Sequence, residues 1–302
     1  MNNSIINASV SLHALQQKLD LLANNVANVN TEGYKRREVS FQDVLTAVKQ
    51  QPEDFELPGR RTPLGITESW GARISPVQIN FEQGSLKSTE QPLDIALEGN
   101  AMIELFEVQR GPDGQPLLGA DGQPLMDRYF TRGGSFKIVQ TEPGSMNGYL
   151  ATQDGHLVRN INFEGELAPI LIPLNHRIVI DTNGNISVYN DQSDSELPTV
   201  MGTLPLYQIK RPQLLENAGN NLFRVADNAV GNDDVMEAIN LNGPRTAATR
   251  DIQVRQGFIE MSNVNLTEQM TELIAVQRAY QLTARALTSA DRLSEMANNL
   301  RS

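Results

Sequence analysis

The two ends of this 302-residue chain resemble each other and differ from everything between them. Residues 1–32 and 258–302 contain no glycine and no proline, and the middle carries all 22 glycines and 15 prolines among short runs of β pattern. Because glycine and proline interrupt helices, only the two ends can form long ones. We predict an α+β fold in which the N- and C-terminal helices pair and the central residues form an all-β domain.

In the N-terminal segment, apolar residues recur at alternating spacings of three and four, the pattern of a coiled-coil seam. The predicted seam is Ile5, Ala8, Leu12, Leu15, Leu19, Leu22, Val26 and Val29. Gly33 follows the last of these and is placed to end the helix in a left-handed conformation. A helix of this length needs packing to be stable, either against its own domain or against another subunit.

The C-terminal segment carries a second apolar stripe, interrupted at Gln277. Its predicted contact residues are Leu266, Met270, Leu273, Tyr280 and Leu287. Asn265 followed by Glu268 predicts a capping box that starts the helix. A helix of about 35 residues spans roughly 50 Å, which exceeds the thickness of a domain of this size. We therefore expect the two stripes to form an assembly interface as a coiled-coil-like inner domain.

The domain organisation follows from the positions of proline and glycine. Four segments are expected: an N-terminal helical assembly segment at 1–45, an extended Pro/Gly-containing connector at 46–75, a central β domain at 76–235, and a return segment with the C-terminal assembly helix at 236–302. Asn183-Gly184 and Asp154-Gly155 each separate two short apolar runs and predict hairpins. A repeated octad at 111–126 predicts a hairpin insertion near 107–128.

The composition excludes several classes of protein. A formal net charge of −11 argues against nucleic-acid binding, which needs a basic surface. No stretch is long and apolar enough to span a membrane, and the first residues lack the basic region of a cleaved signal peptide. The chain has no cysteine, and His13, His156 and His176 have no neighbour at metal-ligand spacing. We expect no enzymatic activity, no metal site and no cofactor.

Separate runs of this sequence resemble the bacterial flagellar basal-body rod and hook family. The first run is Ala23–Lys35; the central runs are Pro92–Gly99 and Tyr129–Phe136; the C-terminal runs are Glu260–Leu266, Gln277–Gln281 and Thr288–Asp291. The predicted family signature consists of Asn24, Asn25, Asn28, Asn30, Thr31, Gly33, Tyr34, Ser262, Asn263, Gln277, Arg278 and Asp291. The amides of Asn24, Asn25 and Asn28 lie beside the seam, where they bond neighbouring helices or are solvated; the sequence leaves both readings open.

The resemblance implies a structural subunit of the flagellar basal body, exported through the flagellar type III apparatus without a cleaved signal peptide. It implies helical polymerisation into a hollow, rigid drive shaft that transmits torque and passes exported subunits. The implied partners are copies of the chain, neighbouring rod and hook axial proteins, and the export apparatus. Residues 46–72 are most similar to the distal rod protein, with a proximal rod or other axial subunit as the alternative. A secreted β-domain enzyme or binding protein with helical oligomerisation ends is the alternative from a different class.

Overall fold

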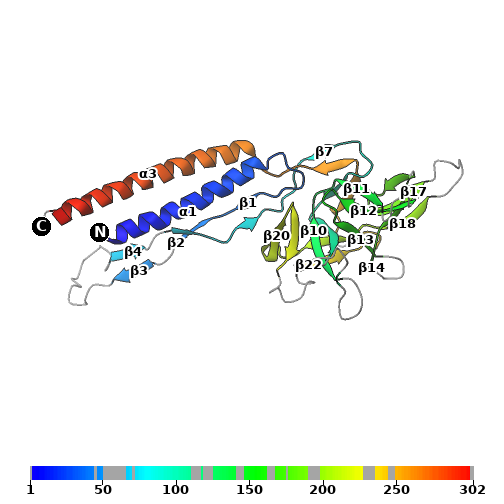
Figure 1. Ribbon diagram of the computed structural model, residues 1–302, viewed down its shortest axis with the longest axis horizontal. Helices are drawn as coiled ribbons and strands as arrows, with labels where there is room; N and C mark the ends of the chain where they lie inside the picture. Colours follow the sequence, from blue (N-terminus) through cyan, green and yellow to red (C-terminus); the bar gives the residue numbers. More distant parts are fainter. Residues whose placement is uncertain are drawn as a thin grey trace. The chain divides into compact units, whose positions relative to one another are not determined.

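The computed structural model describes residues 2–43, 46–49, 66–69, 72–109, 117, 125–140, 146–161, 167–174, 176–189, 198–226, 235–243 and 249–299. The fold is α+β, as predicted, with a helix at each end of the chain and β structure between them (Figure 1). The chain divides into two compact units. Unit 1 comprises Met1–Ala27, Arg37–Gln78 and Val264–Ser302, and unit 2 comprises Asn28–Arg36 and Ile79–Asn263.

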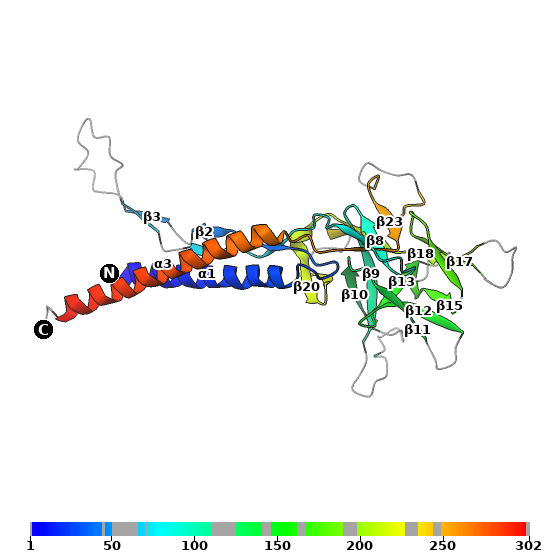
Figure 2. The ribbon, with the colours of Figure 1, turned by 90° about the horizontal axis from the view of Figure 1, so that it is seen from above.

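Unit 1 is built on two helices, α1 (Asn2–Ala27) and α3 (Leu266–Asn299), which lie side by side in both views (Figures 1 and 2). Its strands are β1 (Arg37–Glu38), β2 (Phe41–Asp43), β3 (Thr46–Lys49), β4 (Ile66–Ser69) and β5 (Ala72–Ile74). Strand β2 pairs antiparallel with β5, β3 pairs antiparallel with β4, and β5 packs against α1. Three of these strands fall within the predicted connector, whose residues 50–65 lie outside the described part of the chain.

The start of α3 agrees with the prediction. Asn265 Oδ1 accepts hydrogen bonds from the backbone N–H groups of Thr267 and Glu268, at 3.1 and 3.3 Å, which is the geometry of an N-cap. The helix is 34 residues long, close to the length expected from the sequence.

The predicted end of α1 is wrong, because the helix stops at Ala27 and Val29 lies beyond it. In the turn that follows, Thr31 bonds Asn28 twice: its N–H donates to the backbone oxygen at 3.2 Å and its hydroxyl to Oδ1 at 3.1 Å. Short polar side chains that bond the nearby chain compete in this way with helical hydrogen bonding. Gly33 does adopt a left-handed φ of +67°, but in the loop and not at the helix end.

Unit 2 is a β structure around one large antiparallel sheet. Its elements are β7 (Leu86–Ser88), β8 (Ile95–Glu98), β9 (Ala101–Val108), β10 (Met126–Thr131), β11 (Phe136–Gln140), β12 (Asn147–Thr152), β13 (Leu157–Ile161), β14 (Leu167–Pro169), β15 (Leu171–Pro173), β16 (Arg177–Ile180), β17 (Asn185–Tyr189), β18 (Thr199–Thr203), β19 (Leu206–Ile209), the 3₁₀ helix η2 (Pro212–Leu214), β20 (Leu215–Gly219), β21 (Leu222–Val225), β22 (Met236–Ile239), β23 (Gln253–Gln256) and β24 (Phe258–Glu260). Strand β6 (Gln78–Ile79) lies where the two units meet in sequence.

The large sheet has the strand order β11-β12-β13-β9-β10-β21-β20, with β14, β15, β19 and β22 paired off this path. A separate sheet has the order β16-β17-β18, and two further pairs join β8 to β23 and β7 to β24. Both of these pairs join a strand from the beginning of unit 2 to one from its end. The unit therefore closes only when residues far apart in sequence come together.

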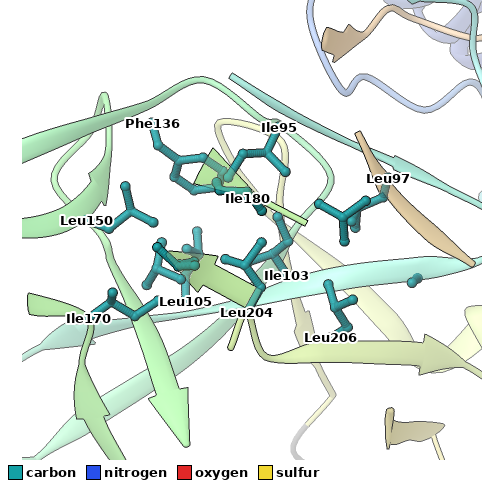
Figure 3. Packing of buried hydrophobic residues seen from close by; sticks show 14 of the residues in the cluster. Ile95, Leu97, Ile103, Leu105, Phe136, Leu150, Ile170, Ile180, Leu204 and Leu206 are labelled. Carbon is teal, nitrogen blue, oxygen red and sulfur yellow. The ribbon is translucent and has the colours of Figure 1, made fainter. Parts of the chain in front are cut away.

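Aliphatic side chains fill the core of unit 2, as the 5% aromatic content suggests. Figure 3 shows Ile103, Leu105 and Leu150, which lie in strands, gathered with Leu204, which lies between β18 and β19. Burial of this apolar surface, at about 25 cal/mol per Å², provides most of the stabilisation. A second cluster, which includes Met102, Phe130, Phe223 and Met236, forms separately.

The hairpin predicted at Asn183-Gly184 is confirmed: β16 and β17 pair antiparallel with Ile180 opposite Ile186, and Gly184 has a φ of +82°. The turn at Gly155 likewise joins the paired strands β12 and β13. The octad repeat lies between β9 and β10, which pair with Val108 opposite Met126. Two of its described residues, Leu117 and Leu125, form with Gln109 a closed ring of three backbone hydrogen bonds of 2.7–2.9 Å.

Candidate functional site

The contact between α1 and α3 in unit 1 has a polar centre. Asn25 on α1 and Gln269 on α3 are 1% and 3% exposed, and Asn25 Nδ2 donates to Gln269 Oε1 at 2.9 Å. Further along, Lys18 Nζ lies 2.5 Å from Glu272 Oε1. An amide pair and an ion pair thus connect the two helices, where the sequence pattern predicts apolar contacts.

Asn25 also holds the chain that returns after α1. Its Nδ2 donates to the backbone oxygen of Arg37 at 2.9 Å, and its Oδ1 accepts from the backbone N–H of Arg37 at 3.1 Å. The side-chain amide of Asn25 therefore pairs with both backbone groups of Arg37 in β1, as the backbone of a neighbouring strand does in a sheet. Of the two readings left open for this residue, the structure supports hydrogen bonding to a helix, within the same chain.

The residues of the N-terminal seam are unequally covered. Only Leu22 is buried, together with the off-seam residue Ala14. The remaining seam residues are half-buried: Ile5, Ala8, Leu12, Leu15, Leu19, Val26 and Val29. Beside the seam, Lys18 Nζ lies 5.1 Å from the ring centroid of Phe41 in β2, and β5 packs against α1.

The C-terminal stripe is divided between two faces of α3. Leu273, Tyr280 and Leu287 are half-buried. Leu266 and Met270 are 45% and 48% exposed, and Ile274, one turn further, is 49% exposed. We call Leu266, Met270 and Ile274 the α3 apolar face; Leu282, Leu293 and Met296 are also exposed but lie further around the helix. Large apolar side chains gathered on one exposed helix face mark an interaction surface more often than singly scattered ones do.

The residues of the predicted signature differ in their surroundings. Asn24, Asn30, Gln277, Arg278 and Asp291 are exposed; Asn28, Thr31 and Asn263 are half-buried; Asn25, Gly33, Tyr34 and Ser262 are buried. Asn263 binds backbone on both sides, because its Oδ1 accepts from Arg36 N–H at 2.7 Å and its Nδ2 donates to the carbonyls of Asn80 and Glu82. Several signature residues therefore connect segments of the fold.

A buried ionic network in unit 2 joins residues from the first, central and last motifs. The carboxylate of Glu260 lies 2.7 Å from Lys35 Nζ and 2.6 Å from Arg132 Nε, and the three side chains are at most 1% exposed. We call these three residues the buried triad. Two cations thus share one anion away from solvent.

Backbone groups satisfy the remaining hydrogen bonds of the triad. The N–H of Gly84 donates to Glu260 Oε1 at 2.7 Å, and Lys35 Nζ donates to the carbonyl of Glu82 at 2.7 Å. Arg132 donates to the carbonyls of Ala101, Gly99 and Leu97, at 3.1, 2.6 and 3.4 Å, around the turn between β8 and β9. Buried charges require this degree of pairing to be tolerated.

Burial and, to a lesser extent, the adjacent Arg132 guanidinium lower the pKa of Lys35 from an ordinary 10.5 to about 8, against the opposing effect of Glu260. Desolvation disfavours the charged ammonium, and a neighbouring cation acts in the same direction.

Two glycines of the motifs allow the chain to pack closely around the triad. A Cβ at Gly134 would lie 1.8 Å from the carbonyl oxygen of Ile95, and one at Gly33 would lie 2.7 Å from the backbone nitrogen of Gly133. Glycine is required at both positions because no side chain fits between these backbones.

Lys35, Arg132 and Glu260 lie inside family-like motifs, but no pattern in the sequence assigns them a role. The available signals were weak: Lys35 lies two residues after Gly33, Arg132 directly precedes Gly133, and Glu260 follows a short apolar run. A single sequence does not show which charges meet in space.

The described residues of unit 2 also line cavities, one of about 300 Å³ beside β10 and β21. Its arginines, Arg128 and Arg224, are already paired, with Glu104 at 2.6 Å and Glu216 at 3.2 Å. In the part of the chain that the structure describes, no three histidine, aspartate or glutamate side chains are grouped to hold a metal ion. Neither α1 nor α3, the long helices of the described chain, is apolar enough to cross a membrane.

Comparison with known proteins gives matches at both ends of the chain. Residues 7–35 match the family model described as flagella basal body rod protein, and residues 255–300 match the model described as flagellar basal body rod FlgEFG protein C-terminal.

Individual relatives align over almost the whole chain. The flagellar basal-body rod protein FlgG of Borreliella burgdorferi is 30% identical over 302 residues, which covers 100% of this chain and 99% of the relative. FlgG of Buchnera aphidicola subsp. Baizongia pistaciae is 30% identical over 287 residues, 95% of each chain. The flagellar hook-basal body complex protein FlhP of Bacillus subtilis is 29% identical over 309 residues, 100% of each chain.

Proposed function

The chain belongs to the flagellar basal-body rod protein family, and from this premise we propose that it is a distal rod subunit that polymerises helically through its terminal helices. As a member of this family it is a structural protein of the flagellar basal body, and not an enzyme. The relatives named above are rod and hook-basal body proteins, so the alternative of a secreted enzyme is set aside.

The α3 apolar face supports the assembly part of this proposal. Within unit 1, α3 presents Leu266, Met270 and Ile274 to solvent at spacings of four, so they form one row along the helix. The row continues the C-terminal stripe of the sequence analysis, while the rest of that stripe is half-buried. A second copy is the natural occupant, because a rod is built from repeated subunits and a non-closing heterologous contact generates a helix.

We extend the proposal to the arrangement of the subunit. Residues 1–45 and 236–302 would form the inner, assembling layer, 46–75 would connect it to the β domain, and 76–235 would form the outer layer. The seam from Ile5 to Val29 would contribute to the same contacts, since most of it is only half-buried. The resulting tube would be a hollow drive shaft, with neighbouring rod and hook axial proteins at its ends, and its subunits would pass through the flagellar type III export apparatus.

The test introduces charge into the α3 apolar face. We expect Met270→Asp combined with Ile274→Asp to abolish sedimentable polymer and swimming, because two buried carboxylates would cost several kcal/mol at each contact. Far-UV circular dichroism and the unfolding of unit 2 should stay unchanged.

The matched control places the same charges on another side of α3: Ala275→Asp combined with Ala286→Asp changes two exposed residues that lie at least about 100° around the helix from Met270 and Ile274. This variant should polymerise. Normal polymer in the first variant, or equal loss in both, would contradict the proposal.

FlhP, named as a hook-basal body complex protein, aligns as fully as the FlgG proteins. This keeps a proximal rod or other axial position as the second candidate. Labelling of purified basal bodies at the octad repeat would decide between the positions.

A further inference from the structure

The contact between α1 and α3 contains one buried amide pair, in addition to the ion pair of Lys18 with Glu272. Asn25 and Gln269 are almost fully buried and bond each other at 2.9 Å, within a helix pair whose other seam residues are largely half-buried. Neither side chain is suited to burial without a partner, because an unmatched amide in an apolar contact loses the free energy of its hydrogen bonds to water.

The apolar seam by itself does not define how α1 and α3 are aligned. Its residues, from Ile5 to Val26, repeat at spacings of three and four, so a shift of one heptad places similar side chains against the same surface. The polar pair does not repeat in this way. A shift by a single turn would move Gln269 about 5.4 Å from Asn25 and leave both amides unmatched.

Asn25 connects this alignment to the rest of unit 1. Its two amide hydrogens are donated to Gln269 and to the carbonyl of Arg37, and its Oδ1 accepts from the N–H of Arg37. One side chain therefore holds α1, α3 and β1 in a single arrangement. In coiled coils, a lone buried asparagine specifies register in the same way, at a cost in stability.

We propose that Asn25, through Gln269, is the specificity-determining residue that sets the register of α1 against α3 and fixes the return of the chain at β1. The pair selects one alignment among several that the apolar seam permits. This role lies within one chain and does not depend on the proposed function; only its consequence for the regularity of a polymer does.

The absence of cysteine from the sequence allows the register to be measured directly. Spin labels at Gln16→Cys and Gln281→Cys, both at exposed positions, report the distance between the helices in the monomeric full-length protein. The parent should give one narrow distance. With Asn25→Leu and Gln269→Leu added, we expect a second population displaced by about 5 Å, one helical turn.

The matched control is Asn24→Leu, a change of an exposed asparagine in the same turn of α1, which should leave the single distance unchanged. Gln269→Leu alone removes the pair but keeps the bonds from Asn25 to Arg37, so it should broaden the distribution without unfolding α1. If both leucine variants keep the parent distance and width, the proposal is overturned. Loss of polymer without any change of register would instead concern the assembly contacts and not Asn25.

Discussion

At the scale of single residues, the least expected feature is a set of charges hidden inside unit 2. Lys35, Arg132 and Glu260 come from three separate motifs, and each has a backbone or ionic partner for its polar atoms. The buried triad has an excess of positive charge, because it contains two cations and one carboxylate. The carboxylate is therefore the residue on which the other two depend.

This imbalance predicts an order among variants. Glu260→Gln would leave two buried cations facing each other, and we expect it to lower the free energy of unfolding by about 3–5 kcal/mol, the range for breaking a buried ion pair. Lys35→Met would leave Arg132 paired with Glu260, so its cost should be smaller. Urea denaturation gives both values.

The partly exposed pair formed by Arg255 and Glu98, 3.0 Å apart in the same unit, provides the control. Glu98→Gln should cost less than about 1 kcal/mol, because solvent already screens that pair. A Lys35→Met variant less stable than Glu260→Gln would show that the charge count does not govern the network.

The lowered pKa of Lys35 predicts an unusual dependence on pH. Between pH 8 and 10.5 the unfolded chain retains a proton on Lys35 that the folded chain has released, so the unfolded state binds more protons and stability rises with pH. The full difference of the two pKa values corresponds to roughly 3 kcal/mol. We expect the parent to gain stability relative to Lys35→Met on going from pH 7.5 to 10, measured by urea unfolding at both values. A constant difference between the two proteins would contradict the lowered pKa.

At the scale of helices and strands, the sequence was sufficient to predict features that involve only neighbouring residues, such as helix caps and tight turns. Asn265 predicts the start of α3 because a cap involves only the next three residues, and Asn183-Gly184 predicts its hairpin because a tight turn needs left-handed backbone at known positions. The predicted end of α1 was wrong, because Asn28 and Thr31 form hydrogen bonds with each other in the turn that follows Ala27, where the helix ends. The apolar pattern through Val29 and the glycine at 33 predict a helix that continues beyond its actual end at Ala27.

The helix contact illustrates what periodicity leaves undetermined. The apolar periodicity predicts which face of each helix is apolar, but it does not show which residues pack against that face. In the structure, Asn25 and Gln269 occupy the buried line, while Leu266 and Met270 remain exposed. The buried triad was likewise invisible, because it joins residues up to 225 positions apart and one sequence contains no record of such proximity.

At the scale of the whole molecule, the charge is distributed very unevenly. Unit 2 contains 25 of the 36 acidic residues and 15 of the 25 basic ones, so its formal net charge is −10, against −1 for unit 1. In a polymer of the proposed kind, the β units of neighbouring copies would repel one another, and the nearly neutral unit 1 would provide the attraction. Apolar contacts such as the α3 apolar face suit that division, since salt does not screen them.

This division predicts that salt promotes assembly. Raising sodium chloride from 0.1 to 1 M shortens the Debye length from about 10 to 3 Å, which weakens repulsion between the β units while leaving apolar contacts intact. We expect sedimentation assays to show a lower critical concentration for polymer at the higher salt. Asp154→Asn with Asp251→Asn, two exposed positions of unit 2, should lower it at 0.1 M and reduce its dependence on salt. Dissociation of the polymer as the salt concentration rises would contradict this prediction. It would mean that ion pairs between copies stabilise the polymer and that the negative charge of unit 2 contributes to the contact.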